Sequence, residues 1–327
     1  MSGLVDRVDG FQRGHGWLGM PIGVVYKFAD DQGGYLAAVL TYYAFVAIFP
    51  MLLIASSVLG FVLQGHPSLQ DQILSSALAQ FPIVGDQLGR PEGIQGSTSA
   101  VVVGTLTALY GLMGLGQAAH SAVNATWAIP RSSRLNPIVS RLRSLVWLVL
   151  AGLALVLIAL LTSLGSHLGV FGAELGSGVH WLAVLATVVL ITGVLAAMMR
   201  LSSPHQERLR EVIPGAAAIA VLWQLLQVLG GVYVEHVISK AGQMNGVFAV
   251  VLGLVALLYI ASLIAVLGLE INVVLAKGLY PRALMSPFTD AVQLTDADKQ
   301  VYREYAQAQR HKSFEQVRVI FDEPSDS

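Results

Sequence analysis

Six long apolar runs dominate the chain, and polar connections separate them. The runs cover approximately residues 36–63, 98–118, 142–164, 179–199, 212–234 and 247–275. Each has roughly the 20 residues that an α-helix needs to cross a hydrocarbon core of about 30 Å. Each run is apolar on all sides, whereas a soluble surface helix is apolar along one stripe. The pattern predicts an all-α polytopic membrane protein with six transmembrane helices.

The basic residues gather in every second connection. The N-terminal segment, the second and fourth connections and the C-terminal segment hold 17 of the 19 Lys and Arg residues. The first and fifth connections contribute only Arg90 and Lys240. Since Lys and Arg are enriched in the cytoplasmic connections of membrane proteins, both termini are predicted to be cytoplasmic. The formal net charge of −1 conceals this segregation.

The polar segments divide the chain into three predicted parts. Residues 1–34 form a cytoplasmic N-terminal segment, residues 35–280 the six-helix domain, and residues 281–327 a cytoplasmic tail. Residues 18–29 have apolar positions at helical spacing with Lys27 beside them, which predicts an interfacial helix tucked against the bundle. A second short helix is expected over residues 67–81 on the outer side, and a third over residues 295–319. The polar residues 1–16 do not have the pattern of a cleavable signal peptide.

Polar side chains interrupt several of the apolar runs at helical spacing. In the second run these side chains lie on one face of the predicted helix. In the fifth run they fall within a sector of about 100°, and in the sixth run two of them are three helical turns apart and share a face. The first run contributes two tyrosines and a proline. The residues that could converge on a common interior path are Tyr42, Tyr43, Pro50, Gln117, His120, Asn124, Gln224, Gln227, Glu235, Tyr259 and Glu270.

Two interpretations of these polar positions remain open. Polar groups in a bilayer face the bundle interior or a water cavity and often mark a substrate path. They also form ordinary interhelical hydrogen bonds, each worth about 0.6–2 kcal/mol. Glu270 approaches the cytoplasmic boundary, where the candidate partners are Arg200, Arg208 and Lys277. Glu235 approaches the outer boundary, where water can hydrate it.

Prolines and glycines predict where helices bend and pack. Pro50 removes a backbone hydrogen bond and is expected to bend the first helix. Pro214 is expected in the first turn of the fifth helix, where a proline is tolerated. Gly111, Gly114 and Gly116 are expected to serve close helix packing.

Patterns that carry enzyme chemistry are missing from the sequence. Cysteine is absent, which excludes disulfides and thiolate ligands. There is no phosphate-binding G-x-x-x-x-G-K-[ST] run, no zinc-binding histidine pair and no G-x-S-x-G elbow. Topology and lipid attraction account for the basic connections, so we expect no nucleic-acid partner. We predict no catalytic residue, metal or cofactor, and therefore no enzyme.

Three stretches resemble the YihY/BrkB family of bacterial inner-membrane proteins. The first is the paired Tyr42-Tyr43 followed by Phe49-Pro50, and the second is Asn124-Ala125-Thr126-Trp127 with the basic residues after it. The third begins with Ile213-Pro214-Gly215-Ala216 and ends with Gly268-Leu269-Glu270-Ile271-Asn272. The family usually has Gly-Ala-Glu at that last position, so Leu269 is a modest departure.

The resemblance covers roughly residues 20–280 and implies a multi-pass protein of the bacterial cytoplasmic membrane. The family has carried a ribonuclease label, for which this sequence offers no catalytic residues. Other members are associated with serum resistance or with export of lipid or envelope material. The resemblance does not supply a substrate.

Two hypotheses of function follow. The first is a transporter or flippase-like protein that moves a lipid or envelope precursor, with membrane lipids as its partners. The alternative is a scaffold that holds envelope enzymes or regulators through its cytoplasmic connections and tail. It expects the bundle to survive loss of residues 287–327. The small-residue faces allow a homo-oligomer without requiring one.

Overall fold

The computed structural model describes residues 2–62, 98–136, 138–147, 149–150, 152–153, 157, 177–202, 208–233, 243–290 and 292–322. Regular structure in these residues is helical throughout, as the apolar periodicity predicts. The helix expected over residues 67–81 and most of the third apolar run lie outside them.

The helices follow the apolar runs and extend a few residues beyond them. Their bounds are α1 (Ser2–Gly14), α2 (Gly16–Asp30), α3 (Gly33–Val62), α6 (Thr98–Thr126), α8 (Ser177–Ser202), α9 (Leu209–Tyr233), α10 (Gln243–Lys277) and α11 (Asp296–Ala308). A short 3₁₀ helix, η2 (Arg131–Ser133), follows α6, and residues 138–147 are also helical.

Within the described part of the chain, three stretches are long and apolar enough to cross a membrane: Val184–Ser202, Leu209–Val232 and Val251–Lys277. Their outward faces carry large apolar side chains, among them Leu185, Val228 and Leu229, which are more than half exposed. A soluble monomer rarely exposes a contiguous apolar surface of this kind. A lipid environment accounts for it.

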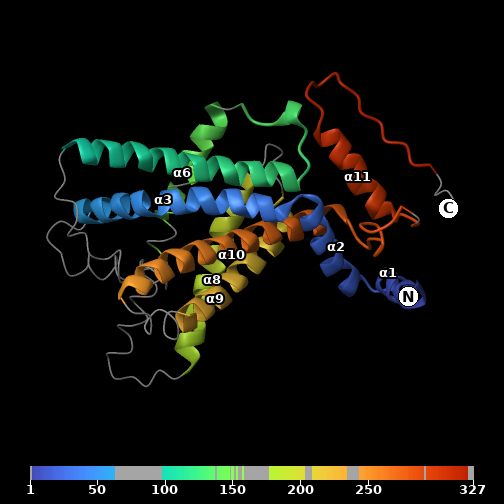
Figure 1. The fold of residues 1–327 in the computed structure, drawn as a ribbon, viewed down its shortest axis with the longest axis horizontal. Coiled ribbons are helices and arrows are strands. Elements are labelled where there is room, and N and C mark those ends of the chain that lie inside the picture. The colour runs from blue at the N-terminus through green and yellow to red at the C-terminus, as the bar shows by residue number, and fades with distance from the viewer. Residues whose placement is uncertain are drawn as a thin grey trace.

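Long helices pack in neighbouring pairs, α3 with α6, α9 with α8 and α10, and α10 with α3 (Figure 1). Glycines permit close approaches between α3 and α6: Gly114 lies against the ring of Tyr43, and Gly111 lies against Val46. These contacts run in opposite directions along α3 and α6, so the two helices are antiparallel. The expectation that glycines of the second run serve packing is confirmed.

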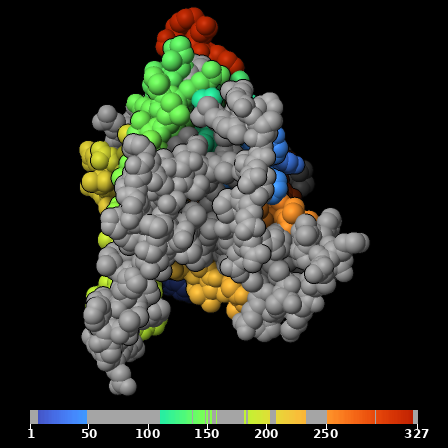
Figure 2. Space-filling view, turned by 90° about the vertical axis from the view of Figure 1, so that its left-hand side faces the viewer, coloured from blue at the N-terminus to red at the C-terminus, as the bar shows by residue number. Residues whose placement is uncertain are grey.

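The two ends of the described chain meet at one end of the bundle. Figure 1 shows α1, α2 and α11 together there, and the Gln12 side-chain amide donates a hydrogen bond to the Arg282 carbonyl at 2.5 Å. Figure 2 shows the segment that begins at η2 against the C-terminal segment, where Ser132 N–H bonds the Arg310 carbonyl. This end of the bundle therefore collects most of the polar chain.

Local chemistry explains where the flanking helices begin and end. The Thr295 hydroxyl accepts from the Asp298 N–H, and the Asp298 side chain accepts from the Thr295 N–H, which forms a capping box at the start of α11. The helix ends at Ala308, so the expected helix over residues 295–319 was too long. Helix α9 begins at Leu209, so Pro214 lies inside it rather than in its first turn.

Candidate functional site: a buried charge cluster

Helix α2 and the residue that follows it bring Lys27, Asp30 and Asp31 to one end of the bundle. Its Gly19 and Gly23 allow close contact with residues 279–281, and Gly23 also lies against Val274 of α10. This approach buries Lys27 near the C-terminal end of α2. The expected helix over residues 18–29, tucked against the bundle, is confirmed, and Lys27, predicted beside its apolar positions, is buried.

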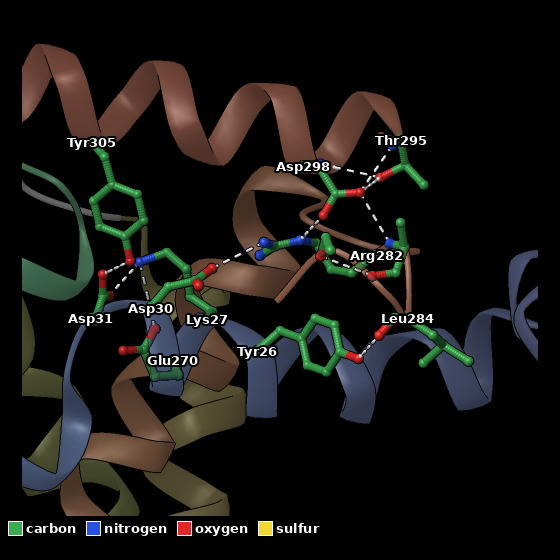
Figure 3. Close-up of polar contacts among 12 residues, drawn as sticks. Tyr26, Lys27, Asp30, Asp31, Glu270, Arg282, Leu284, Thr295, Asp298 and Tyr305 are labelled. Carbon is green, nitrogen blue, oxygen red and sulfur yellow. Dashed lines mark hydrogen bonds and ion pairs between the residues drawn. The ribbon is translucent and has the colours of Figure 1, made fainter. Parts of the chain in front are cut away.

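Lys27 occupies the centre of a cluster of charges (Figure 3). Its Nζ donates to the Asp31 carboxylate and, at 3.0 Å, to the Thr126 carbonyl at the end of α6. Glu270 Oε2 lies 3.8 Å from the same nitrogen. The Lys27 side chain is 1% exposed, so its charge depends on these neighbours for stabilisation.

Glu270 differs from the other carboxylates of the cluster. Its side chain is fully buried on the apolar helix α10, and neither carboxylate oxygen accepts a hydrogen bond from any residue that the structure describes. Lys27 lies within ion-pair distance but beyond hydrogen-bond distance. Glu270 therefore lacks the donors that normally stabilise a buried anion.

A second set of charges is centred on Arg282, just after α10. Its Nε donates to Asp298 at 2.5 Å, and one terminal nitrogen donates to Asp30 at 2.9 Å. Asp298 also accepts from the Ala283 and Thr295 N–H groups. Burial lowers the pKa of Arg282, but its bonds and charges with Asp298 and Asp30 outweigh burial and raise it. The guanidinium is thus held as a cation.

Asp30 connects the two sets of charges, since it follows Lys27 on α2 and pairs with Arg282. Burial raises the pKa of Asp30, and this effect outweighs the opposing influence of Arg282 and Lys27. Its side chain remains 26% exposed. Asp30 is therefore the member of the cluster that reaches solvent most readily.

Helix α11 closes the cluster from outside the bundle. The Tyr305 hydroxyl donates to Asp31, and burial together with the Asp31 charge raises the pKa of Tyr305. Lys277 donates to Glu304 at 2.8 Å and to the Trp127 carbonyl at 2.9 Å. Lys27 and Lys277 thus both place a positive charge at the C-terminal end of α6, where the helix dipole favours one.

The cluster holds more negative than positive groups. Lys27 and Arg282 face four carboxylates, those of Asp30, Asp31, Glu270 and Asp298. Among the described residues, no group of three His, Cys, Asp or Glu is arranged to hold a metal ion. The arrangement is suited to binding protons and to exchanging ion-pair partners.

The polar residues predicted on α6 lie mainly inside the bundle. His120 is 3% exposed, and its ring lies 6.3 Å from that of Trp147. Gln117 is partly buried and accepts from the Ser140 hydroxyl at 3.4 Å, and Asn124 is partly buried. Ser121 is exposed, so the polar residues of α6 do not share one buried face.

The other predicted path residues are more dispersed. Gln224 and Gln227 are partly buried on α9, while Tyr259 of α10 and Tyr42 of α3 are 37% and 58% exposed. Tyr43 packs edge-on against Tyr42 and beside Gly114. Pro50 falls within α3, but its side chain is not among those that the structure describes, and the predicted bend stays a prediction. Glu235 lies outside the described residues.

Sequence reasoning identified Glu270 but not the residues around it. Lys27 from α2 takes the place that Arg200, Arg208 or Lys277 was expected to fill. Asp31, Arg282, Asp298 and Tyr305 were missed because charged residues outside the apolar runs are usually at the surface. The Thr295-x-x-Asp298 spacing was a usable signal for the start of α11.

Comparison with known families places most of the chain. Residues 24–287 match the family model described as virulence factor BrkB. Comparisons with curated proteins and with solved structures gave no match. The matched region includes α2, α10 and Arg282 of the charge cluster, while α11 lies beyond it.

Proposed function

The chain belongs to the virulence factor BrkB family, and we propose that it is a transporter or flippase-like protein of the bacterial cytoplasmic membrane. Its cargo is a lipid or an amphiphilic envelope precursor. The family and the apolar helices establish a membrane protein. The proposal adds movement of a substrate across or within the bilayer.

The proposed topology has six spans with both termini in the cytoplasm. The packing of α1, α2 and α11 at one end of the bundle supports termini on the same side (Figure 1). The distribution of Lys and Arg supports assignment of that side to the cytoplasm. In this topology the buried charge cluster lies at the cytoplasmic end of the bundle.

The buried Glu270 carboxylate carries the proposal. A scaffold has no need for an ionisable group that is fully buried in an apolar helix and has no hydrogen-bond donor among the described residues. Ionisable residues inside membrane spans are rare and usually mark transport or proton pathways. Glu270 is therefore the group on which we base the mechanism.

In the proposed mechanism Glu270 and Glu235 stand at opposite ends of an amphiphile path. The middle of the path is assigned to Gln224, Gln227, His120 and Tyr259, with Gln117, Asn124, Tyr42 and Tyr43 beside it. The regions of Pro50 and Gly215 are assigned to helix movement. The partial burial of Gln224 and Gln227 on α9 is compatible with this assignment.

Cysteine accessibility tests the path without knowledge of the substrate, because the chain has no cysteine. Single cysteines at positions 117–124, 220–233 and 256–270 would be treated with membrane-impermeant thiol reagents from each side. Labelling with helical periodicity deep in the spans supports a water-filled path. Labelling confined to the helix ends would indicate a dry bundle and would favour the scaffold hypothesis over transport.

Lipid movement is the direct test. Purified protein in vesicles with fluorescently labelled phosphatidylethanolamine should accelerate exchange of the label between leaflets, as measured by quenching of the outer leaflet with dithionite. E270Q should abolish the acceleration, whereas D290N, at an exposed carboxylate, should retain it. Equal exchange in E270Q and the unaltered protein would remove Glu270 from the mechanism.

A scaffold remains the alternative, and one observation favours it. The C-terminal segment exposes Phe288, Phe314 and Ile320, each at least 77% exposed. Aromatic side chains such as Phe are enriched in protein–protein interfaces, so these positions suit contact with a partner protein. F314S together with I320S should then abolish cellular function while leaving lipid movement and the charge cluster unchanged.

A further inference from the structure

The proposed mechanism does not yet explain the charge state of Glu270. Two buried cations face four carboxylates in the cluster. Three of these carboxylates have clear stabilising partners. Asp298 accepts from Arg282 and two backbone N–H groups, Asp31 accepts from Lys27 and Tyr305, and Asp30 pairs with Arg282 at the edge of solvent.

Glu270 is the remaining carboxylate, and its surroundings do not stabilise a second negative charge. The charged and titratable groups that face it are Lys27 and Asp30 of α2, Asp31 directly after α2, and Tyr305 of α11. Lys27 is committed to Asp31 and to the Thr126 carbonyl. Two of the other neighbours are acidic. An unsolvated anion beside like charges is far less stable than the neutral acid.

We infer that Glu270 binds a proton and that the protein uses the proton as its coupling ion, with Lys27 as the group that responds to proton release. The coupling of the proton to transport rests on the proposed function, whereas the proton site on Glu270 rests on the geometry alone.

The exchange of partners follows from the position of Lys27. Its ammonium has three N–H donors, of which the structure assigns two. When the Glu270 proton leaves to solvent, the new carboxylate attracts the ammonium 3.8 Å away. Closer approach to Glu270 weakens the bonds of Lys27 to Asp31 and to the Thr126 carbonyl, and the second of these bonds joins α2 to the end of α6. Proton release is thereby linked to the contact between helices.

The proton is favoured over a metal cation as the ligand. A Na⁺ or Mg²⁺ site needs several oxygen ligands directed at one point. Here the Lys27 ammonium already lies between Asp31 and Glu270 (Figure 3), so a second cation would face its repulsion. A protonated Glu270 needs only one acceptor for its O–H group, and the neighbouring Asp31 carboxylate can be that acceptor.

Infrared spectroscopy of the purified full-length protein tests the site. A protonated carboxylic acid has a carbonyl band that an ionised carboxylate lacks, and isotopic labelling of glutamate identifies a band from Glu rather than Asp. We expect a protonated glutamate band at neutral pH that disappears at alkaline pH. The band should be lost in E270Q and retained in E235Q and D290N.

Each outcome is decisive for the proton site. Absence of a protonated glutamate in the unaltered protein would overturn the inference, and isotopic labelling gives this result even if E270Q fails to fold. A band that survives in E270Q or disappears in E235Q would overturn it as well. A band assigned to Glu270 without lipid movement in vesicles would leave the proton site standing and remove the transport function. Lipid movement that is insensitive to a pH gradient, with no such band, would leave transport standing without proton coupling.

Discussion

Gly215 of α9 and Gly268 of α10 bring the backbones of the two helices into direct contact. A Cβ atom on Gly215 would lie 1.9 Å from the Gly268 carbonyl oxygen. The contact is reinforced by Asn272, whose side-chain oxygen accepts from the Gly215 N–H at 2.6 Å. The stretches 213–216 and 268–272, which carry the family resemblance, therefore meet in space.

We predict that G215A forces α9 and α10 apart. The added methyl group would clash with backbone rather than with a flexible side chain, and overpacking of this kind destabilises by about 1–3 kcal/mol. G231A is the matched control on the same helix, because no atom lies within 4 Å of a Cβ built there. Thermal unfolding in detergent, followed by tryptophan fluorescence, should show a lower midpoint for G215A alone. Equal midpoints for the two variants would contradict the close contact.

Removing the Arg282 charge should destabilise the end of the bundle. R282M leaves Asp298 buried without its cation, and breaking a buried ion pair by removing one partner costs about 3–5 kcal/mol. R13Q provides the comparison, since the Arg13–Asp9 pair is partly exposed and such pairs contribute about 0–1 kcal/mol. Limited proteolysis and thermal unfolding would measure both. A stability of R282M close to that of R13Q would show that Asp298 does not need Arg282.

The helices were predictable because a long apolar segment in a bilayer must satisfy its backbone hydrogen bonds internally, which an α-helix does. The run at residues 179–199 became α8, Ser177–Ser202, and the run at 36–63 became α3, Gly33–Val62. Helix α6 extends to Thr126, beyond the predicted end at 118, because Gln117, His120 and Asn124 continue the helix as polar positions. Hydropathy detects the apolar part of a spanning helix but does not locate the residue at which a polar end of that helix stops.

The charge cluster was not predictable for a different reason. Lys27 and Glu270 are separated by most of the chain, and no local pattern couples their positions. Lys27, Arg282 and Asp298 are residue types that usually lie at a solvated surface. Their burial is stable only because they pair with opposite charges. Glu270 was found because its setting, an apolar span, is unusual for a carboxylate at the level of sequence.

Tyr305 provides a prediction about pH. Because burial and Asp31 raise its pKa above the ordinary value of 10.0, the folded state favours the neutral phenol. Its stabilising contribution is complete below the unfolded pKa and is lost as pH rises through the folded pKa. At about pH 11 most exposed tyrosines ionise, but Tyr305 should not. The phenolate absorbance of the folded protein should therefore be the same for Y305F and the unaltered chain.

After unfolding in denaturant at the same pH, the unaltered chain should show one phenolate more than Y305F. An additional phenolate already present in the folded unaltered protein would show that Tyr305 is accessible to base. Y305F also removes the donor to the buried Asp31, so a loss of about 1–3 kcal/mol is expected at neutral pH.

Truncation of the C-terminal segment separates the structural role of α11 from any scaffold role. Removing residues 293–327 eliminates Asp298, Glu304 and Tyr305, and with them the partners of Arg282, Lys277 and Asp31. We therefore expect this truncation to lower the thermal midpoint and to expose the end of the bundle to protease, whereas the scaffold hypothesis expects the bundle to survive. Removing only residues 313–327 retains α11 with these contacts and should leave the midpoint unchanged. If both truncations unfold at the temperature of the full chain, α11 does not hold the cluster together, and loss of cellular function on truncation would then indicate a binding partner.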